Sequence, residues 1–324
     1  MIPTYVFGAT GYVGAELMRL VVTHPGLYLA GSVSSSAAGR RVADVLPGLA
    51  LALPDAVFIS ADEAVAEIGR EAEVAIFLAL PHGESARTAK RLLESAPPGR
   101  HVVDLSADFR FADPAVYEAW HGSAHPAPDL IGAFFCGHPE LHPDTKPLAA
   151  AHPGCFTTSV VLPLAPLWQA GLIGPSVQVA GVTGSTGSGR EPKPGTHHPE
   201  RHGNLWAYSP LVHRHASEMT ILVEEHGAEG LDLAFVPHSG PFARGIHSTI
   251  FAELTGPLTA EDVTEQINAF YGDRGPFVRA FTSPPTVKQV AGTNACRIGV
   301  ATQGKRLVLA SVVDNLLKGA AGGA

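Results

Sequence analysis

Residues 4–14 of the chain read TYVFGATGYVG. They join a short apolar run, a loop with three glycines and the start of a segment with helical spacing that reaches Val22. A buried strand, a glycine-rich turn and a helix in this order form the dinucleotide-binding turn of parallel α/β sheets. In such a turn Gly8 allows a tight bend, Gly11 lets the backbone approach a pyrophosphate, and Gly14 lets the helix pack on the strand. The stretch therefore predicts an α/β protein that begins with a Rossmann-type doubly wound parallel sheet.

The next strand, expected at residues 27–33, indicates which dinucleotide binds. An NAD site usually ends this strand with an acidic residue for the ribose 2′-hydroxyl. Here residues 34–41 read SSSAAGRR, and hydroxyls with two arginines suit a 2′-phosphate, which favours NADP(H). The alternative is a solvated serine loop. The residues expected to contact the cofactor in this half are Gly8, Thr10, Gly11, Tyr12, Val13, Gly14, Ser34, Ser36, Arg40, Leu80 and Pro81.

Two further strands are expected at residues 74–80 and 101–105, because both runs are apolar. His82 and Arg110 follow them closely, and ligands of open α/β sheets gather at the carboxyl ends of strands. Arg110 can hold a phosphate or carboxylate with two hydrogen bonds. Its alternative role is an ion pair with a neighbouring acid such as Asp108 or Asp113.

A candidate nucleophile follows in residues 152–158, HPGCFTT. The apolar run that reaches Trp168 predicts a helix that starts at Cys155, where free backbone N–H groups and the helix dipole favour a thiolate. Gly154 lacks a side chain, so we expect it to leave room for a substrate beside the sulfur. The alternative is that Cys155 is an ordinary small buried residue.

The second half changes character, because its strands follow one another without regular helices between them. This pattern indicates an α+β second domain. Residues 213–215, HRH, precede a helical segment, and a base there could serve Cys155. His197, His198 and His202 match no standard zinc spacing, so no metal is expected.

Composition excludes several classes of function. The net charge of −8 argues against nucleic acid as a partner, and no apolar run is long enough for a membrane span. Three cysteines are too few for a disulfide framework. We therefore expect a cytoplasmic enzyme that takes a small molecule.

Together the motifs resemble the N-acetyl-γ-glutamyl-phosphate reductases, the arginine-biosynthesis branch of the aspartate-semialdehyde dehydrogenase superfamily. They occur in the family's order and span nearly the whole chain. The matching stretches are 8–14 (GATGYVG), 79–83 (ALPHG), 104–110 (DLSADFR), 153–155 (PGC), 213–215 (HRH) with Glu218, 244–246 (RGI) and 314–319 (DNLLKG).

The resemblance implies a mechanism. Cys155 would attack the γ-acyl phosphate and form a thioester, NADPH would deliver hydride to it, and His213 would be the acid/base. Substrate contacts would come from Arg110, Arg201, His215 and Glu218, with Arg110 near the leaving phosphate. Ser185, Gly187 and Asn315 would contact the cofactor.

The resemblance also implies an organisation. Residues 1–154 would bind NADP, residues 155–312 would form the catalytic and dimerisation domain, and residues 313–324 would return to the first domain. A homo-oligomer, a dimer or a tetramer, is expected.

Two departures leave the substrate open. Residues 136–140 read CGHPE where the family has Tyr-Gly-Leu-Pro-Glu. Residues 196–201, THHPER, resemble the lysine-pathway reductases that act on a carrier-linked aminoadipyl phosphate, which implies an acidic carrier protein or dual specificity. The aspartate-semialdehyde dehydrogenases share the cysteine and the dinucleotide turn, but residues 213–215 (HRH) and 106–110 (SADFR) fit them poorly. A non-enzymatic NADP-binding sensor is a further alternative.

Overall fold

The computed structural model describes residues 1–95 and 98–324. The chain forms two compact units. Unit 1 comprises Met1–Gly137, Lys146–His152 and Ala324, and unit 2 comprises His138–Thr145 and Pro153–Gly323. Residues 313–323 thus count with unit 2, and the domain limits expected above stay a prediction. Within the described residues no helix is long and apolar enough to cross a membrane.

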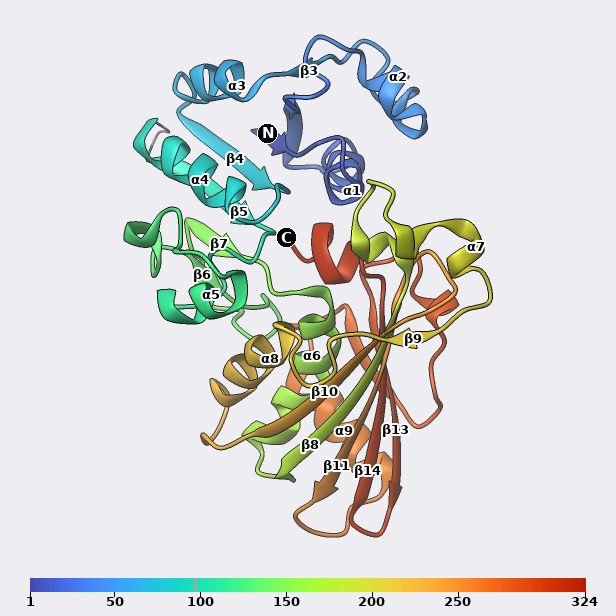
Figure 1. The fold of residues 1–324 in the computed structure, drawn as a ribbon. Helices are drawn as coiled ribbons and strands as arrows, with labels where there is room; N and C mark the ends of the chain where they lie inside the picture. The colour runs from blue at the N-terminus through green and yellow to red at the C-terminus, as the bar shows by residue number, and fades with distance from the viewer. Residues whose placement is uncertain (96–97) are drawn as a thin grey trace. The chain divides into compact units, whose positions relative to one another are not determined.

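Unit 1 is built on a parallel sheet of seven strands in the order β3-β2-β1-β4-β5-β7-β6 (Figure 1). This order confirms the Rossmann-type sheet. The glycine loop follows β1, at the carboxyl edge where ligands of such sheets bind. The strands are β1 (Ile2–Phe7), β2 (Leu27–Val33), β3 (Phe58–Ile59), β4 (Glu73–Leu78), β5 (Gly99–Asp104), β6 (Phe135–Cys136) and β7 (Ala149–Ala151).

Helices cover both faces of this sheet: α1 lies on one side, and α3 and α4 lie on the other (Figure 1). The apolar stripe of α1 buries Leu17, Met18 and Val21. A capping box, in which Ser60 and Glu63 bond each other's backbone N–H groups, starts α3. The helices are α1 (Tyr12–Val21), α2 (Val42–Val45), α3 (Ala61–Ile68), α4 (Glu84–Ser95) and α5 (Pro114–His121).

Unit 2 is built on a mixed sheet of seven strands in the order β12-β13-β14-β11-β8-β10-β9. The pairs β8–β10 and β12–β13 are parallel, and the other pairs are antiparallel. The strands are β8 (Ile173–Thr183), β9 (Trp206–Ala207), β10 (Asp232–Ser239), β11 (Ile246–Leu254), β12 (Val278–Phe281), β13 (Cys296–Gln303) and β14 (Arg306–Val313).

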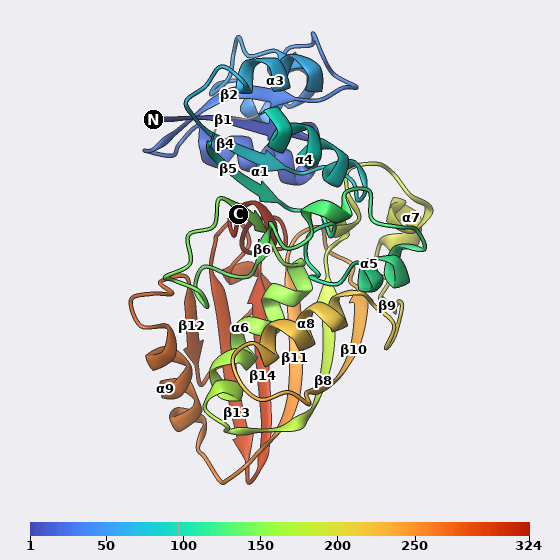
Figure 2. The same ribbon diagram turned by 90° about the vertical axis from the view of Figure 1, so that its left-hand side faces the viewer.

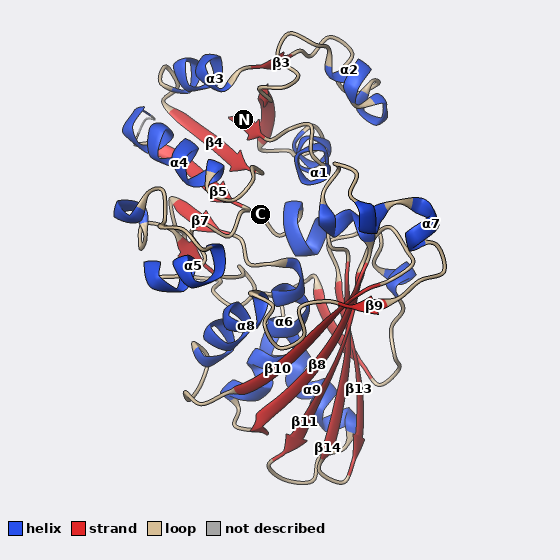
Figure 3. Ribbon diagram, in the orientation of Figure 1, coloured by secondary structure: helices blue, strands red, loops and turns tan. Residues whose placement is uncertain are grey.

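Helices α6 (Cys155–Gln169), α8 (His215–Glu224) and α9 (Ala260–Tyr271) lie against one face of this second sheet (Figure 2). The short α7 (His198–Arg201) belongs to the long excursion between β8 and β9 (Figure 3). Every residue of α6 from Phe156 to Leu167 is buried, as in a helix that is surrounded by protein. Because α6 is fixed along its length, its first residue, Cys155, has a rigid support.

Candidate functional site

Cys155 is the first residue of α6, as the sequence predicts, and its N-cap is Gly154 in extended conformation. The first N–H groups of a helix have no partner within the helix, and the dipole places partial positive charge there. The Cys155 side chain is partly exposed. A partly exposed thiol at a helix N-terminus is the environment in which a reactive thiolate is favoured.

Glu218, on α8, holds the start of α6. Its Oε2 accepts hydrogen bonds from the backbone N–H of Gly154 at 2.8 Å and from Thr157 Oγ1 at 2.9 Å. The Glu218 side chain is 1% exposed, so these bonds replace its hydration. Glu218 therefore fixes the residue before the thiol. Its predicted contact with substrate stays a prediction.

His215 fills the space beside Gly154. A Cβ on Gly154 would lie 2.4 Å from His215 Nε2, closer than any side chain can approach. The expectation that Gly154 leaves this space to a substrate is therefore wrong: glycine makes room for a buried imidazole. His215 Nε2 also lies 3.9 Å from Glu218 Oε1, so the histidine and the carboxylate support the start of α6 together.

His213 is held in a defined orientation. Its Nδ1 accepts a hydrogen bond from the backbone N–H of His215 at 3.2 Å, so the neutral ring carries its proton on Nε2. Burial, and next the positive charge of Arg214, lower the pKa of His213 to about 4, while Glu218 opposes them. At neutral pH the ring is therefore an uncharged donor at Nε2.

The loop before His213 is under backbone strain. Ser209 and Leu211 have φ of +44° and +64°, in the region that side chains disfavour. Two backbone bonds to β10 keep the loop in place, from the Tyr208 N–H to the Pro237 carbonyl at 3.0 Å and from the Leu211 N–H to the Phe235 carbonyl at 2.9 Å. A strained but anchored loop suits a residue that must be placed accurately.

Cys155, His213 and His215 line one cavity of about 560 Å³, so the structure brings the predicted nucleophile and acid/base together. Burial, and next the negative charge of Cys155, raise the pKa of Tyr208 well above its usual value, so its hydroxyl stays neutral there. Within the described chain the lining includes nitrogen bases and cations but no carboxylate. The full lining is Cys155, Phe156, Thr183, Gly187, Ser188, Lys193, Gly195, Thr196, Arg201, Trp206, Tyr208, Ser209, Val212, His213, Arg214, His215 and Ser239.

Arg201 is a buried guanidinium in this lining. Its N–H groups donate to Ser239 Oγ and to the Gly240 carbonyl, and its guanidinium lies over the Trp206 ring at 5.4 Å. Burial lowers the pKa of Arg201. No described carboxylate pairs with it, and its Nε has no hydrogen-bond partner among the described residues. These features suit a residue that receives an anionic ligand.

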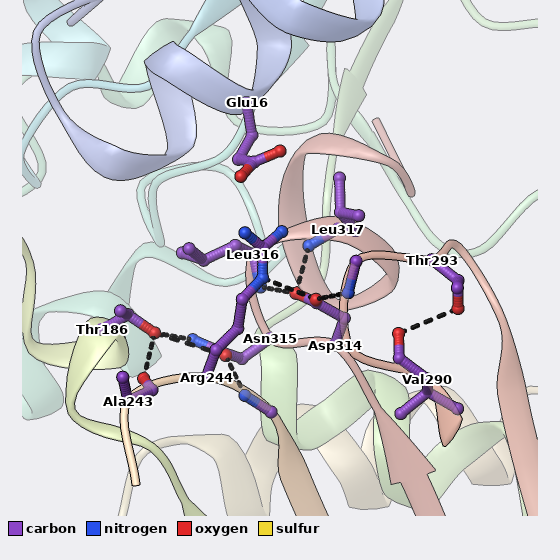
Figure 4. A network of polar contacts seen from close by, with 12 residues as sticks. Glu16, Thr186, Ala243, Arg244, Val290, Thr293, Asp314, Asn315, Leu316 and Leu317 are labelled. Atoms are coloured by element: carbon purple, nitrogen blue, oxygen red, sulfur yellow. Dashed lines mark hydrogen bonds and ion pairs between the residues drawn. The ribbon is translucent and has the colours of Figure 1, made fainter. Parts of the chain in front are cut away.

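Asn315 ties the loop after β8 to the end of β14 (Figure 4). Its Oδ1 accepts from the Gly245 N–H at 2.7 Å, and its Nδ2 donates to Thr186 Oγ1 at 3.0 Å. Both ends of the amide thus hold protein groups. Of the two loop residues predicted to meet the cofactor, Gly187 lines the cavity, and the Ser185 N–H donates to the Phe242 carbonyl at 3.0 Å. Their contacts with the cofactor, and that of Asn315, stay predictions.

The glycine loop of unit 1 has the geometry of a dinucleotide turn. Gly8 has φ of +73°, and a Cβ there would lie 2.2 Å from the Ala79 carbonyl oxygen. A Cβ on Gly14 would lie 2.3 Å from the Gly8 carbonyl oxygen, so only glycine lets α1 pack this closely. Gly11 is the N-cap of α1. A Cβ on Gly8 would also lie 3.4 Å from the Leu80 N–H nitrogen, so Leu80, and Pro81 after it, follow β4 beside this loop.

A chain of hydroxyl groups follows β2. Thr10 Oγ1 lies 3.3 Å from Ser34 Oγ, which lies 3.4 Å from Ser36 Oγ. Arg40 is exposed in the same loop. Hydroxyls and a cation, with no acidic residue at the strand end, fit a ribose that carries a 2′-phosphate.

Arg110 lies in a polar network at the ends of β4 and β5, where it donates to the Leu105 carbonyl at 2.9 Å. Asp108 accepts from the N–H groups of Gly83 and Ala86 and so caps α4, while His82 Nδ1 accepts from the Ala107 N–H. Asp108 is therefore occupied with the helix. Arg110 belongs to unit 1, and its phosphate role stays a prediction.

Sequence reasoning missed Lys193, Trp206, Tyr208 and Arg214 as lining residues. Lys193 and Trp206 lie in the excursion between β8 and β10, where no periodicity indicates which side chains turn inward. Arg214 could have been found, because it stands between two candidate histidines. Among the described residues no group of His, Cys, Asp and Glu side chains could hold a metal ion.

Comparison with known proteins adds family information. A model described as the NAD binding domain of semialdehyde dehydrogenases matches residues 4–146, and one described as their dimerisation domain matches residues 155–315. A protein of Dehalococcoides mccartyi named N-acetyl-gamma-glutamyl-phosphate reductase is 39% identical, over 98% of this chain and 91% of its own. Proteins of the same name are 39% identical in Rhodopirellula baltica (98% and 92%) and 38% identical in Methanopyrus kandleri (99% and 93%).

Solved structures show the same fold at low identity. Aspartate semialdehyde dehydrogenase II from Vibrio cholerae, complexed with ASA, superposes with a TM-score of 0.73 at 15% identity, over 100% of this chain and 96% of that one. Aspartate semialdehyde dehydrogenase with NADP from Candida albicans gives 0.67 at 15% identity, over the same shares. At these identities the likeness concerns the fold alone.

Proposed function

The chain belongs to the N-acetyl-γ-glutamyl-phosphate reductase family of semialdehyde dehydrogenases, and from this premise we propose how its own residues carry the reaction. The enzyme reduces N-acetyl-γ-glutamyl phosphate to N-acetylglutamate semialdehyde, releases phosphate, uses NADP(H) and serves arginine biosynthesis. The observation that carries the proposed mechanism is the helix-terminal thiol of Cys155 in a cavity that it shares with His213.

Cys155 is the nucleophile. Its sulfur attacks the acyl carbon, so a carbon–sulfur bond forms while the bond from that carbon to the phosphate oxygen breaks and phosphate leaves. Glu218 and His215 support this step because they fix Gly154 and the start of α6. The covalent intermediate divides one difficult substitution into two easier ones.

His213 stabilises charge on the reacting oxygen. His213 lines the cavity that also holds Cys155, and a donor at its Nε2 toward the thioester carbonyl would lower the barrier to a tetrahedral intermediate. When the tetrahedral intermediate collapses to the semialdehyde, the carbon–sulfur bond breaks and the sulfur leaves as a thiolate, which the start of α6 favours. The hydrogen bond from the His215 N–H occupies Nδ1 and so leaves Nε2 as the donor for the reacting oxygen.

The residues of unit 1 fit the cofactor. Gly8, Gly11 and Gly14 would hold the pyrophosphate at the start of α1, and Ser34, Ser36 and Arg40 would hold the 2′-phosphate. When bound, NADP(H) supplies or accepts the hydride of the redox step.

The cationic cavity suits the negative charge of the substrate. N-acetyl-γ-glutamyl phosphate carries an α-carboxylate and an acyl phosphate, and a buried guanidinium without a carboxylate partner is a strong site for one of them. We assign the α-carboxylate to Arg201, because its guanidinium already lies against Trp206 in the lining. The leaving phosphate is assigned to Arg110, on the family resemblance.

The substrate is a small molecule, and the match of residues 155–315 to a dimerisation domain supports a homo-oligomer. The size of the oligomer, a dimer or a tetramer, stays a prediction. The acidic carrier protein and the cytoplasmic location also stay predictions. The carrier would meet the exposed residues around α7.

The experiment is the reverse reaction of the purified protein, the NADP-dependent, phosphate-requiring oxidation of a semialdehyde. N-acetylglutamate semialdehyde and carrier-linked aminoadipate semialdehyde are compared at equal concentration. We expect a preference for the free acetylated compound. A preference for the carrier-linked compound would assign the enzyme to the lysine branch, and the absence of NADPH formation with both would leave the NADP-binding sensor.

A further inference from the structure

One glycine near the C-terminus contacts the reactive cysteine. Residues 317–321 form a single wide turn whose five residues are all buried. The N–H groups of Gly319 and Ala321 donate to the carbonyl oxygens of Asp314 and Leu316, five residues earlier in each case. A turn with this spacing is rare, and such turns are found mostly at functional sites.

The turn passes Cys155 at a distance that only glycine permits. A Cβ on Gly319 would lie 2.7 Å from Cys155 Cβ and 3.1 Å from Cys155 Cα. Gly319 does not have a positive φ, so its backbone conformation is open to any residue. Glycine is required at this position for space, and the space in question is that of the nucleophile.

The wide turn cannot easily move away from Cys155. The Asp314 carboxylate accepts from the N–H groups of Leu316 and Leu317, from the Gly292 N–H and from Arg244 Nε (Figure 4). At the other side of Gly319, Lys318 forms an ion pair with Glu140 in which both side chains are almost fully buried. Separating a buried pair leaves an uncompensated charge, so both ends of the turn are fixed.

We propose that Gly319 is a positioning residue for the reaction. The fixed wide turn forms a wall behind Cys155, and the missing side chain of Gly319 sets how far the thiol projects into the cavity. This inference rests on the proposed role of Cys155. It predicts that one methyl group at position 319 displaces the sulfur relative to the donor on His213.

The test compares Gly319→Ala with Gly256→Ala, a matched control in unit 2 where nothing lies within 4 Å of an added Cβ. We expect Gly319→Ala to lower kcat on the order of 10²-fold while KM changes by about twofold or less, because a small misplacement of reacting atoms is costly. The rate and pH dependence of Cys155 alkylation by iodoacetamide should change as well. The control should match the wild type in both assays. Wild-type kcat and alkylation in Gly319→Ala would overturn the inference.

A double-mutant cycle covers the case in which Gly319→Ala is unstable. Cys155→Gly removes the Cβ that an alanine at 319 would meet, so Gly319→Ala should lower Tm less in the Cys155→Gly background than in the wild type. An equal decrease of Tm in the two backgrounds, or failure to fold in both, would show that Gly319 serves the fold alone. Either result would contradict the inference. Because alkylation and Tm need no substrate, a wild type without reductase activity would refute the proposed function and leave this test intact.

Discussion

Glu218 Oε2 accepts a hydrogen bond of 2.8 Å from the backbone N–H of Gly154, the residue before Cys155. The bond joins α8 to the first turn of α6, and the same oxygen accepts from Thr157. An acidic residue at a helix start also complements the dipole. The position of the thiol thus depends on a residue far away in the sequence.

A pair of variants separates the charge of Glu218 from its hydrogen bonds. Glu218→Ala leaves the Gly154 N–H and the Thr157 hydroxyl without their acceptor, so we expect a loss of about 2 kcal/mol or more in the free energy of unfolding. The misplaced thiol should lower kcat by roughly 10- to 100-fold. Glu218→Gln keeps an acceptor oxygen and should retain most of the stability. Urea unfolding and steady-state kinetics measure both, and equal damage by the two variants would contradict the account.

The fall of kcat/KM on the acid side of the pH profile tests the protonation state of His213. Its pKa is lowered to about 4, chiefly by burial, so the ring stays neutral as pH falls through the usual range of histidine. Protonation at Nδ1 would replace the acceptor of the His215 N–H with a competing donor. We therefore expect kcat/KM to fall near pH 4 and not near the ordinary histidine value of about 6.5.

His213→Gln is the control for the acid side of this pH profile. The glutamine amide can donate a hydrogen bond but does not titrate, so activity should be lower and the limb near pH 4 should be absent. Circular dichroism at each pH monitors folding. A wild-type limb between about pH 6 and 7 that disappears in His213→Gln would show a histidine with an ordinary pKa.

Stability in acid depends on His138. Burial, and next the charge of Lys318, lower the pKa of this histidine to about 3 in the folded protein. The unfolded chain binds the proton near pH 6.5, so between about pH 6.5 and 3 it holds one more proton than the native state. The free energy of unfolding must therefore fall as the pH falls through this window.

His138→Leu, the residue of the family pattern at this position, removes the effect. Between about pH 7 and pH 5 the wild type should lose roughly 2 kcal/mol more than the variant. The variant also loses the 3.0 Å bond between His138 Nε2 and Thr158 Oγ1, but that loss is the same at both pH values and cancels. If urea unfolding shows the same loss of unfolding free energy in the wild type and in the variant between these pH values, the low pKa of His138 is contradicted.

The loop after β2 should decide between the two dinucleotides. Ser34→Asp places a carboxylate where NAD sites hold the ribose 2′-hydroxyl and where a 2′-phosphate is repelled. We expect the ratio of kcat/KM for NADP to that for NAD to fall on the order of 100-fold. Arg40→Gln should raise KM for NADP and leave KM for NAD unchanged. An unchanged ratio in Ser34→Asp would show that this loop does not contact the 2′-phosphate.

Local patterns were enough to predict the elements that carry the chemistry. β2 follows the expected residues 27–33, and α6 starts at Cys155, because apolar spacing and a glycine cap act within a few residues. β12 and β13 carry no such local signal. β12 has four residues, and β13 contains Gly299, where a Cβ would lie 2.7 Å from Pro285 Cδ. Neither strand thus has the signal of a long apolar run.

Contacts between distant segments could not be predicted from one sequence. The purpose of Gly154 depends on His215, and the purpose of Gly319 depends on Cys155. In both cases glycine leaves room for a neighbouring residue that only the fold brings close. The motifs indicate that these glycines matter, but the geometry supplies the physical reason.

The most direct test of the mechanism is to quench the reverse reaction before phosphate is added and to measure the mass of the Cys155 peptide. Enzyme, NADP and N-acetylglutamate semialdehyde should form NADPH in an amount close to one per active site, with an N-acetylglutamyl group on Cys155. Phosphate should then release the acyl group and permit turnover, and Cys155→Ser should show neither. Full turnover in Cys155→Ser, or an unmodified Cys155 after the burst, would contradict the thioester mechanism.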